Sequence, residues 1–228
     1  MAIIEYQWKR YLKYIFEQGH THTKDDSEIQ EVLGYHTQIL SPINFLWVYG
    51  EKGEEFFLNA IRGGTYNIPN YPIKDEALYK YVTAWDQDDM INCDNFVYTY
   101  PERLFNYPIN QYEIIKNRLL NNLGSNRGVA VLYNPFKDGE REDIPCLNWL
   151  QATVRDKKLM LHCMFRSNDI YGAWPSNMML LSYLGIKLAN ELDNVVFHGI
   201  DYHCSSAHYY KTDEDAVKRI IRGGINER

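Results

Sequence analysis

The stretch that decides the fold is LNWLQATVRDKKLMLHCMF, residues 147–165. Two runs within it, 147–154 and 158–165, alternate in part between apolar and polar side chains, as strands of a half-buried sheet do. The three residues between the runs, Arg155, Asp156 and Lys157, are polar and charged and predict a turn. We therefore expect a β-hairpin whose two arms meet at residue 156.

Helical and extended patterns follow one another along the rest of the chain. Apolar residues at helical spacing predict helices over 3–18, 52–62, 74–85, 110–122, 175–191 and 213–222. Runs of β-formers predict strands within 28–49 and over 128–134 and 194–204. The polar segment 20–27 is expected to be a loop. These patterns predict one α+β domain over residues 1–228, with a mixed or mostly antiparallel sheet flanked by helices.

The composition narrows the class of protein. A chain of 228 residues can bury one sizeable core. The formal net charge is −6 and there is no block of Lys or Arg, so we expect no nucleic-acid partner. No apolar run approaches the roughly 18–20 residues of a membrane span, and the first residues do not resemble a signal peptide. Four cysteines without a disulfide-framework spacing favour a reduced, cytoplasmic setting.

One of these cysteines is a candidate nucleophile. Cys146 precedes the first arm of the hairpin and Arg166 follows the second, about equally far from the turn. The hairpin should therefore bring Arg166 alongside Cys146. A neighbouring guanidinium favours the reactive thiolate form of cysteine. The alternative interpretation is that Cys146 is a small buried hydrophobic residue.

The residues that follow the hairpin, RSND (166–169), could hold an anion. Arg166 offers a forked, permanently charged donor, and Ser167 adds a hydroxyl, which together suit a phosphate. Alternatively, Arg166 pairs with Asp169. Asn177 stands at the start of the helix expected over 175–191, where its amide could read an imide edge such as that of uracil, or could serve only the first helical turn.

A histidine-rich stretch near the C-terminus, FHGIDYHCSSAHYY (197–210), contains side chains that could bind zinc. Its spacing matches no common ligand pattern, and its side chains would alternate between the two faces of a strand, so we expect no metal. His208 and Tyr210 are two residues apart and should project to one face, where both could bind a sugar hydroxyl. His36 and His162 fall in expected strands and are interpreted as structural histidines.

Taken together, these motifs resemble the thymidylate synthase family. The match is strong over residues 145–210 and runs through four motifs: IPC (144–146), LQATVRDKKL (150–159), RSND (166–169) with Asn177, and SAHYY (206–210). The order and spacing of separate motifs make the resemblance specific. Upstream, SNRGVA (125–130) is similar to the family's arginine-pair segment, and YTYPERLF (98–105) resembles the short archaeal-type members.

The resemblance implies a role for each of these residues. Cys146 would add to C6 of a pyrimidine nucleotide, and C5 would then attack the methylene of a reduced folate. Tyr100 looks like the family's tyrosine near the nucleophile. The ligand contacts implied are the 5′-phosphate for Arg166 and Ser167, the base for Asp169 and Asn177, and the sugar 3′-hydroxyl for His208 and Tyr210.

Two further cations extend the implied phosphate site. Arg127 would reach into the neighbouring subunit, so a homodimer is expected, and Lys24 stands near the place of another phosphate arginine. Asn126 replaces the first of the family's two arginines. The family's proton-managing glutamate has no clear counterpart, and three weak candidates for its role are Glu54, Glu55 and Glu102.

The expected activity is transfer of a one-carbon unit from 5,10-methylenetetrahydrofolate, or a related reduced pterin, to C5 of dUMP, which yields dTMP. One alternative is a hydroxymethylase acting on dUMP or UMP. Such an enzyme acting on dCMP is disfavoured, because cytosine-specific members carry aspartate where this chain has Asn177. The missing glutamate and Asn126 motivate another alternative, a non-catalytic nucleotide-binding homologue.

Overall fold

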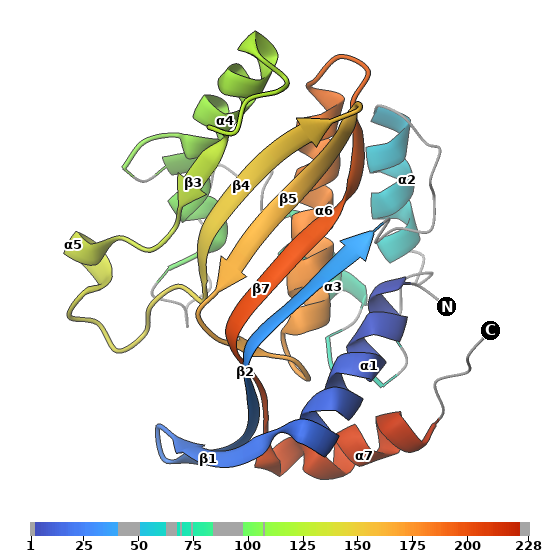
Figure 1. Ribbon diagram of the computed structural model, residues 1–228. Helices are drawn as coiled ribbons and strands as arrows, with labels where there is room; N and C mark the ends of the chain where they lie inside the picture. Colours follow the sequence, from blue (N-terminus) through green and yellow to red (C-terminus); the bar gives the residue numbers. More distant parts are fainter. Residues whose placement is uncertain are drawn as a thin grey trace.

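The computed structural model describes residues 3–40, 51–62, 68, 70–73, 75–83, 98–106 and 108–223. Helices and strands are interspersed along the chain (Figure 1). The elements are α1 (Ile3–Gln18), β1 (His20–Lys24), β2 (Ser27–Leu40), α2 (Glu51–Arg62), α3 (Asp75–Val82), η2 (Glu102–Asn106), α4 (Gln111–Asn121), β3 (Val129–Val131), α5 (Pro135–Asp138), β4 (Leu147–Arg155), β5 (Lys158–Phe165), β6 (Asn168–Asp169), α6 (Trp174–Asn190), β7 (Val196–Tyr210), η3 (Lys211–Asp213) and α7 (Glu214–Arg222). Within the described ranges, no helix has the length and apolar character needed to cross a membrane.

The strands form one seven-stranded mixed sheet in the order β1-β2-β7-β5-β4-β3, with the short β6 beside β7. β7 runs parallel to β5 and to β6, and the other pairs are antiparallel. This is the α+β architecture that the sequence predicts.

The hairpin expected over residues 147–165 is confirmed as β4 and β5. Its register runs from Leu147 opposite Phe165 to Arg155 opposite Lys158. Asp156 and Lys157 both have positive φ, at 49° and 61°, which is the geometry of a two-residue turn whose twist matches that of the strands. The turn therefore sets the register that aligns the two ends of the hairpin.

Among the described residues, helices cover one face of the sheet and no helix covers the other. α6 lies behind the sheet in Figure 1, and almost all of its residues are buried. Alternate residues of the hairpin, such as Ala152 and Leu161, point to this side and have no exposed surface. The intervening side chains are half-buried or exposed, and we call the surface that they form the open face; it includes Trp149, Gln151, Met160, His162 and Met164.

Three expected boundaries were wrong. Residues 20–24 form β1 rather than a loop, because Asp25 and Asp26, at φ 47° and 63°, turn the chain so that β1 pairs with β2. Four of the five β1 residues are exposed, so no apolar pattern marks the strand. The strand expected over 194–204 continues to Tyr210, since β2 pairs with it that far. The strand expected over 128–134 covers only 129–131, and residues 41–49 of the expected strand region lie outside the described residues.

Candidate active site

A cavity of about 540 Å³ opens at the end of the sheet where β1, β6 and β7 meet the start of α6. Eight of the ten residues expected in the site line it: Lys24, Tyr100, Cys146, Ser167, Asp169, Asn177, His208 and Tyr210. They come from separate parts of the chain, which the sheet and α6 bring together. The two arginines of the expected set, Arg127 and Arg166, are not among the described residues that line it.

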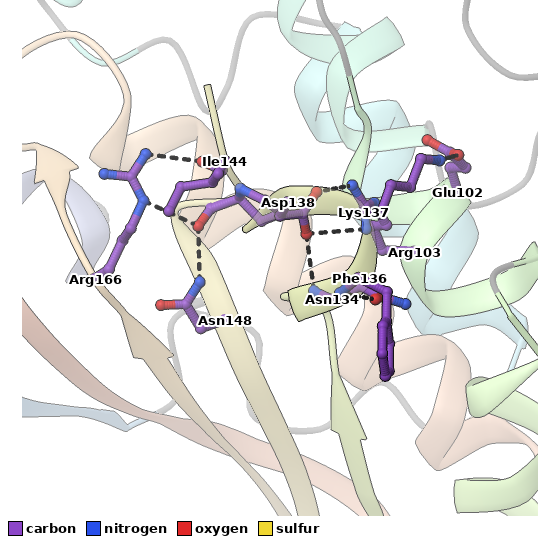
Figure 2. Close-up of polar contacts among 10 residues, drawn as sticks. Glu102, Arg103, Asn134, Phe136, Lys137, Asp138, Ile144, Asn148 and Arg166 are labelled. Carbon is purple, nitrogen blue, oxygen red and sulfur yellow. Dashed lines mark hydrogen bonds and ion pairs between the residues drawn. The ribbon is translucent and has the colours of Figure 1, made fainter. Parts of the chain in front are cut away.

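Arg166 lies beside Cys146 as the hairpin symmetry predicts. The backbone N–H of Arg166 donates to the carbonyl oxygen of Cys146 at 2.8 Å. Its guanidinium, however, is turned toward the main chain: Nε donates to the oxygen of Pro145 at 3.2 Å and Nη2 to that of Ile144 at 2.8 Å (Figure 2). The amide of Asn148 donates to the same Pro145 oxygen at 2.8 Å. Arg166 therefore holds the loop that presents the thiol.

A buried ion pair anchors the other end of this loop. Arg103 donates through Nη1 and Nη2 to the two carboxylate oxygens of Asp138, at 3.1 and 2.6 Å (Figure 2). The backbone N–H of Asn134 donates to the same carboxylate at 2.8 Å. The side chains of Arg103 and Asp138 are 1% and 0% exposed. Because Arg103 follows Tyr100 by three residues and Asp138 precedes Cys146 by eight, the pair ties the tyrosine segment to the thiol segment.

Tyrosine side chains surround the thiol. The hydroxyl oxygen of Tyr100 accepts the backbone N–H of Leu147 at 3.3 Å. Burial raises the pKa of Tyr100 well above its ordinary value, and burial together with the charge of Cys146 raises the pKa of Tyr98. Both phenols are therefore neutral at physiological pH and keep a proton that they can donate beside the sulfur.

A chain of hydrogen bonds fixes the amide of Asn177. The hydroxyl of Tyr81 donates to Oδ1 of Asn177 at 2.5 Å, and Nδ2 of Asn177 donates to Oδ1 of Asn168 at 3.3 Å. Nδ2 of Asn168 in turn donates to the hydroxyl of Tyr202 at 3.0 Å. Both Asn177 and Asn168 are buried. The amide expected to read the base is thus held between α3 and β7, and the sequence had no signal for Tyr81, because a tyrosine on an apolar helix face also fits a core.

The carboxyl group of Asp169 also lines the cavity. Its Oδ1 accepts the backbone N–H groups of Tyr171 and Gly172, each at 3.0 Å. Burial raises the pKa of Asp169 to about 6, against the smaller opposing effect of these hydrogen bonds. The carboxyl group can therefore change protonation state close to neutral pH, as groups at functional sites often do.

On β7, the strand next to Asp169, His208 and Tyr210 both line the cavity, as expected from their spacing. Their rings meet edge to face with centroids 5.5 Å apart. Burial, helped by the charge of Lys24, lowers the pKa of His208 to about 4, so its imidazole is neutral. Nζ of Lys24 lies 6.0 Å from the ring centroid of Tyr210. Lys24, His208 and Tyr210 therefore offer one cation and neutral hydrogen-bonding groups.

The three glutamates considered for proton transfer lie elsewhere. Glu54 accepts hydrogen bonds from Tyr183 and Asn190, and Glu102 pairs with Lys137. Glu55 is exposed. None of the three lines the cavity as the described residues define it. Among the described residues, tyrosines line the cavity near the thiol.

A thiol among neutral phenols, a fixed amide and a lysine is a combination that suits nucleophilic chemistry on a polar, anionic ligand. The chain belongs to the thymidylate synthase family, whose model, described as "Thymidylate synthase", matches residues 73–225. A provisionally named thymidylate synthase of Methanothermobacter marburgensis is 30% identical over 95% of this chain and 94% of its own length. A protein of the same provisional name from Methanocaldococcus jannaschii is 34% identical over 66% of this chain and 71% of its own.

Proposed function

We propose that this protein transfers a one-carbon unit from 5,10-methylenetetrahydrofolate, or a related reduced pterin, to C5 of dUMP and so forms dTMP. The observation that carries the proposal is that Cys146, Asn177, Asp169 and His208 line one cavity. They include a nucleophile, hydrogen-bonding groups for a base and a neutral group for a sugar. Family membership supports the same reaction class.

The thiolate of Cys146 attacks C6 of the uracil ring, which forms the C6–S bond and moves an electron pair toward C5 and O4. The amide of Asn177 stabilises the charge that develops on O4, because a positioned donor in a cavity with little water costs no reorganisation during the step. Once C5 has bonded to the one-carbon unit, loss of the C5 proton breaks the bond between that carbon and the folate nitrogen. Addition of hydride to the same carbon then restores the C5=C6 double bond, breaks the C6–S bond and releases the thiolate.

The cavity has room and suitable walls for the second substrate. Its volume of about 540 Å³ falls within the range of roughly 300–1,000 Å³ typical of ligand pockets. Ile73, Tyr81, Pro101 and Leu180 supply an apolar wall against which a flat pterin ring can pack. When bound, the reduced folate supplies the methylene carbon and the hydride that converts it to a methyl group.

The phosphate end of the nucleotide is assigned to Lys24 and Ser167, with His208 and Tyr210 at the sugar. Arg166 contributes by holding the loop in place, and its Nη1 takes part in neither of the two bonds to the main chain. Arg127 is exposed on the loop before β3, where its side chain can extend to a second subunit. A cytoplasmic homodimer with Arg127 shared between subunits is therefore part of the proposal.

The direct test is to incubate the protein with methylenetetrahydrofolate and dUMP, UMP or dCMP and to weigh the products. We expect dTMP from dUMP and a matching rise in dihydrofolate absorbance. A hydroxymethylated nucleotide without that rise would replace the proposal with the hydroxymethylase alternative.

Tyr81→Phe should lower kcat/KM for dUMP by about 10- to 100-fold, because it removes the hydroxyl that orients the Asn177 amide, a change of roughly 1–3 kcal/mol in transition-state stabilisation. Steady-state kinetics check this. Tyr79→Phe is the matched control on the same helix, since its hydroxyl contacts Arg62 outside the cavity. Equal losses in both variants would contradict a positioning role for Tyr81.

Asp169→Asn should raise the free energy of unfolding at pH 8 by about 1–3 kcal/mol while it impairs catalysis. The folded-state pKa, raised from 3.8 to about 6, means that the folded chain binds more protons than the unfolded chain between these values. The contribution of Asp169 to the free energy of unfolding is therefore at its maximum below about pH 4 and is lost as the pH rises through 6. The amide of asparagine can still accept the two N–H bonds but carries no charge.

Urea unfolding of Asp169→Asn and the natural chain at pH 4, 6 and 8 checks this sign. The gap between the two should be small at pH 4 and should widen toward pH 8. Using the difference removes the contribution of His208, whose lowered pKa acts in the opposite direction in both proteins. If the difference in the free energy of unfolding is constant with pH, the charged carboxylate of Asp169 does not destabilise the folded chain.

A further inference from the structure

Three histidines converge on one carboxylate on the open face of the sheet. Asp201 accepts contacts from His36 Nε2 at 2.8 Å, from His162 Nδ1 at 2.9 Å and from His203 Nε2 at 3.3 Å. The strand register produces the cluster, because His36 lies opposite His203 between β2 and β7, and His162 lies opposite Asp201 between β5 and β7. None of the four lines the catalytic cavity.

The cluster also lies on the opposite side of the sheet from the cavity. Along β7, Asp201 and His203 alternate with Tyr202 and Cys204, which are buried on the covered face. His208 belongs to the same alternating set as Tyr202 and Cys204, and it faces the cavity. The cluster therefore lies outside the proposed nucleotide site.

The donor atoms suit a transition metal. One ligand atom each from His36, Asp201 and His203 lie within 4.8 Å of one another. Zinc–nitrogen and zinc–oxygen bonds of about 2.0–2.2 Å place tetrahedral ligands roughly 3.3 Å apart, so small side-chain shifts would let an ion take the place of the shared protons. Two imidazoles and a carboxylate favour Zn²⁺ over Mg²⁺ or Ca²⁺, which prefer oxygen ligands.

An ion can reach the histidine cluster from solvent, and a neighbouring side chain holds the Asp201 carboxylate in place. The side chains of His36 and His203 are 51% and 42% exposed, so an ion can enter from solvent. The carboxylate of Asp201 is held from behind by His162, whose other ring nitrogen, Nε2, lies 2.9 Å from the hydroxyl of Thr153. Such outer contacts orient metal ligands and raise metal affinity.

We propose that His36, Asp201 and His203 bind one divalent transition-metal ion, for which Zn²⁺ is the best match, with the fourth position open to water. The ion joins β2 to β7 across the open face and acts in stability rather than in catalysis. His162 is a positioning residue that orients Asp201. The site extends the interpretation of the histidines beyond the structural roles expected for His36 and His162.

The test is titration of the purified, metal-free full chain with ZnCl₂, by calorimetry and by metal analysis after gel filtration. We expect one Zn²⁺ per chain and a higher Tm in its presence. His36→Ala and His203→Ala should each weaken binding at least tenfold. The double variant His20→Ala/His22→Ala, which removes two histidines from the exposed strand β1, should bind as the natural chain does.

The proposal would be overturned by no saturable binding, by undiminished binding in His203→Ala, or by loss of binding in the β1 double variant. Loss of binding in Cys146→Ser would also overturn it, because the ion would then be on the catalytic thiol. His36→Gln keeps a polar, exposed side chain and replaces His36→Ala if that variant does not fold. dTMP formation is measured separately, so failure of the metal site leaves the proposed reaction untouched.

Discussion

Cys146→Ser is expected to abolish dTMP formation, with a loss in kcat of roughly 10⁴-fold or more. The serine hydroxyl does not ionise near neutral pH, so C6 of the uracil receives no anionic nucleophile. The replacement is nearly isosteric at a half-buried position, and Arg166 holds the loop through the main chain, so the fold should be retained. The loss should therefore fall on the chemical step.

Tritium release from dUMP labelled at C5 measures this step directly. The natural chain should release tritium when the reduced folate is present, and Cys146→Ser should not. Cys163→Ala is the matched control, because Cys163 is a buried thiol that donates to the main chain of Asp201 outside the cavity. Undiminished release by Cys146→Ser would refute the role of the thiol, and no release by the natural chain would favour a non-catalytic homologue.

The largest stability effect is expected for Arg103→Ala, at about 3–5 kcal/mol lost from the free energy of unfolding. The substitution leaves the carboxylate of Asp138 buried without the cation that holds it by two hydrogen bonds. It also releases the link between the Tyr100 segment and the loop before Cys146. We expect the folded fraction to show lower kcat as well.

Urea unfolding checks this result, and the neighbouring ion pair supplies the control. Lys137→Ala breaks a pair with Glu102 that joins the same two elements, η2 and α5, but its side chains keep contact with water. Its cost should be about 0–1 kcal/mol. The double variant Arg103→Met/Asp138→Leu should recover much of the lost stability, because no lone charge remains buried. A loss below 1 kcal/mol in Arg103→Ala would contradict the anchoring role.

Local patterns in the sequence were enough to predict the hairpin and what it brings together. The alternation over 147–165 and the short turn set the register, and the register places Arg166 beside Cys146. The spacing of His208 and Tyr210 likewise predicted that they share a face, because a strand has a period of two. Both predictions depend on residues that are close in sequence or related by one turn.

Local patterns did not predict the contacts between segments that are far apart in the sequence. Tyr81 and Asn177 are 96 positions apart, and neither residue indicates that their side chains meet. The guanidinium of Arg166 is turned to the main chain by the loop that Arg103 and Asp138 anchor, so its chemistry could not be read from the RSND motif alone. The polar strand β1 was missed because its partner β2, rather than an apolar pattern, defines it.

The sequence by itself determined the α+β class, the hairpin and the identity of the groups that could do chemistry, because periodicity and side-chain type are local properties. Only the tertiary structure decided which of these groups face the cavity and which hold the scaffold. In the folded chain the Arg166 guanidinium points toward the backbone, and Tyr81 donates a hydrogen bond to Asn177. His36 and His203 both contact Asp201. Strand pairing and helix packing across long separations set those positions, and no short stretch of sequence encodes them.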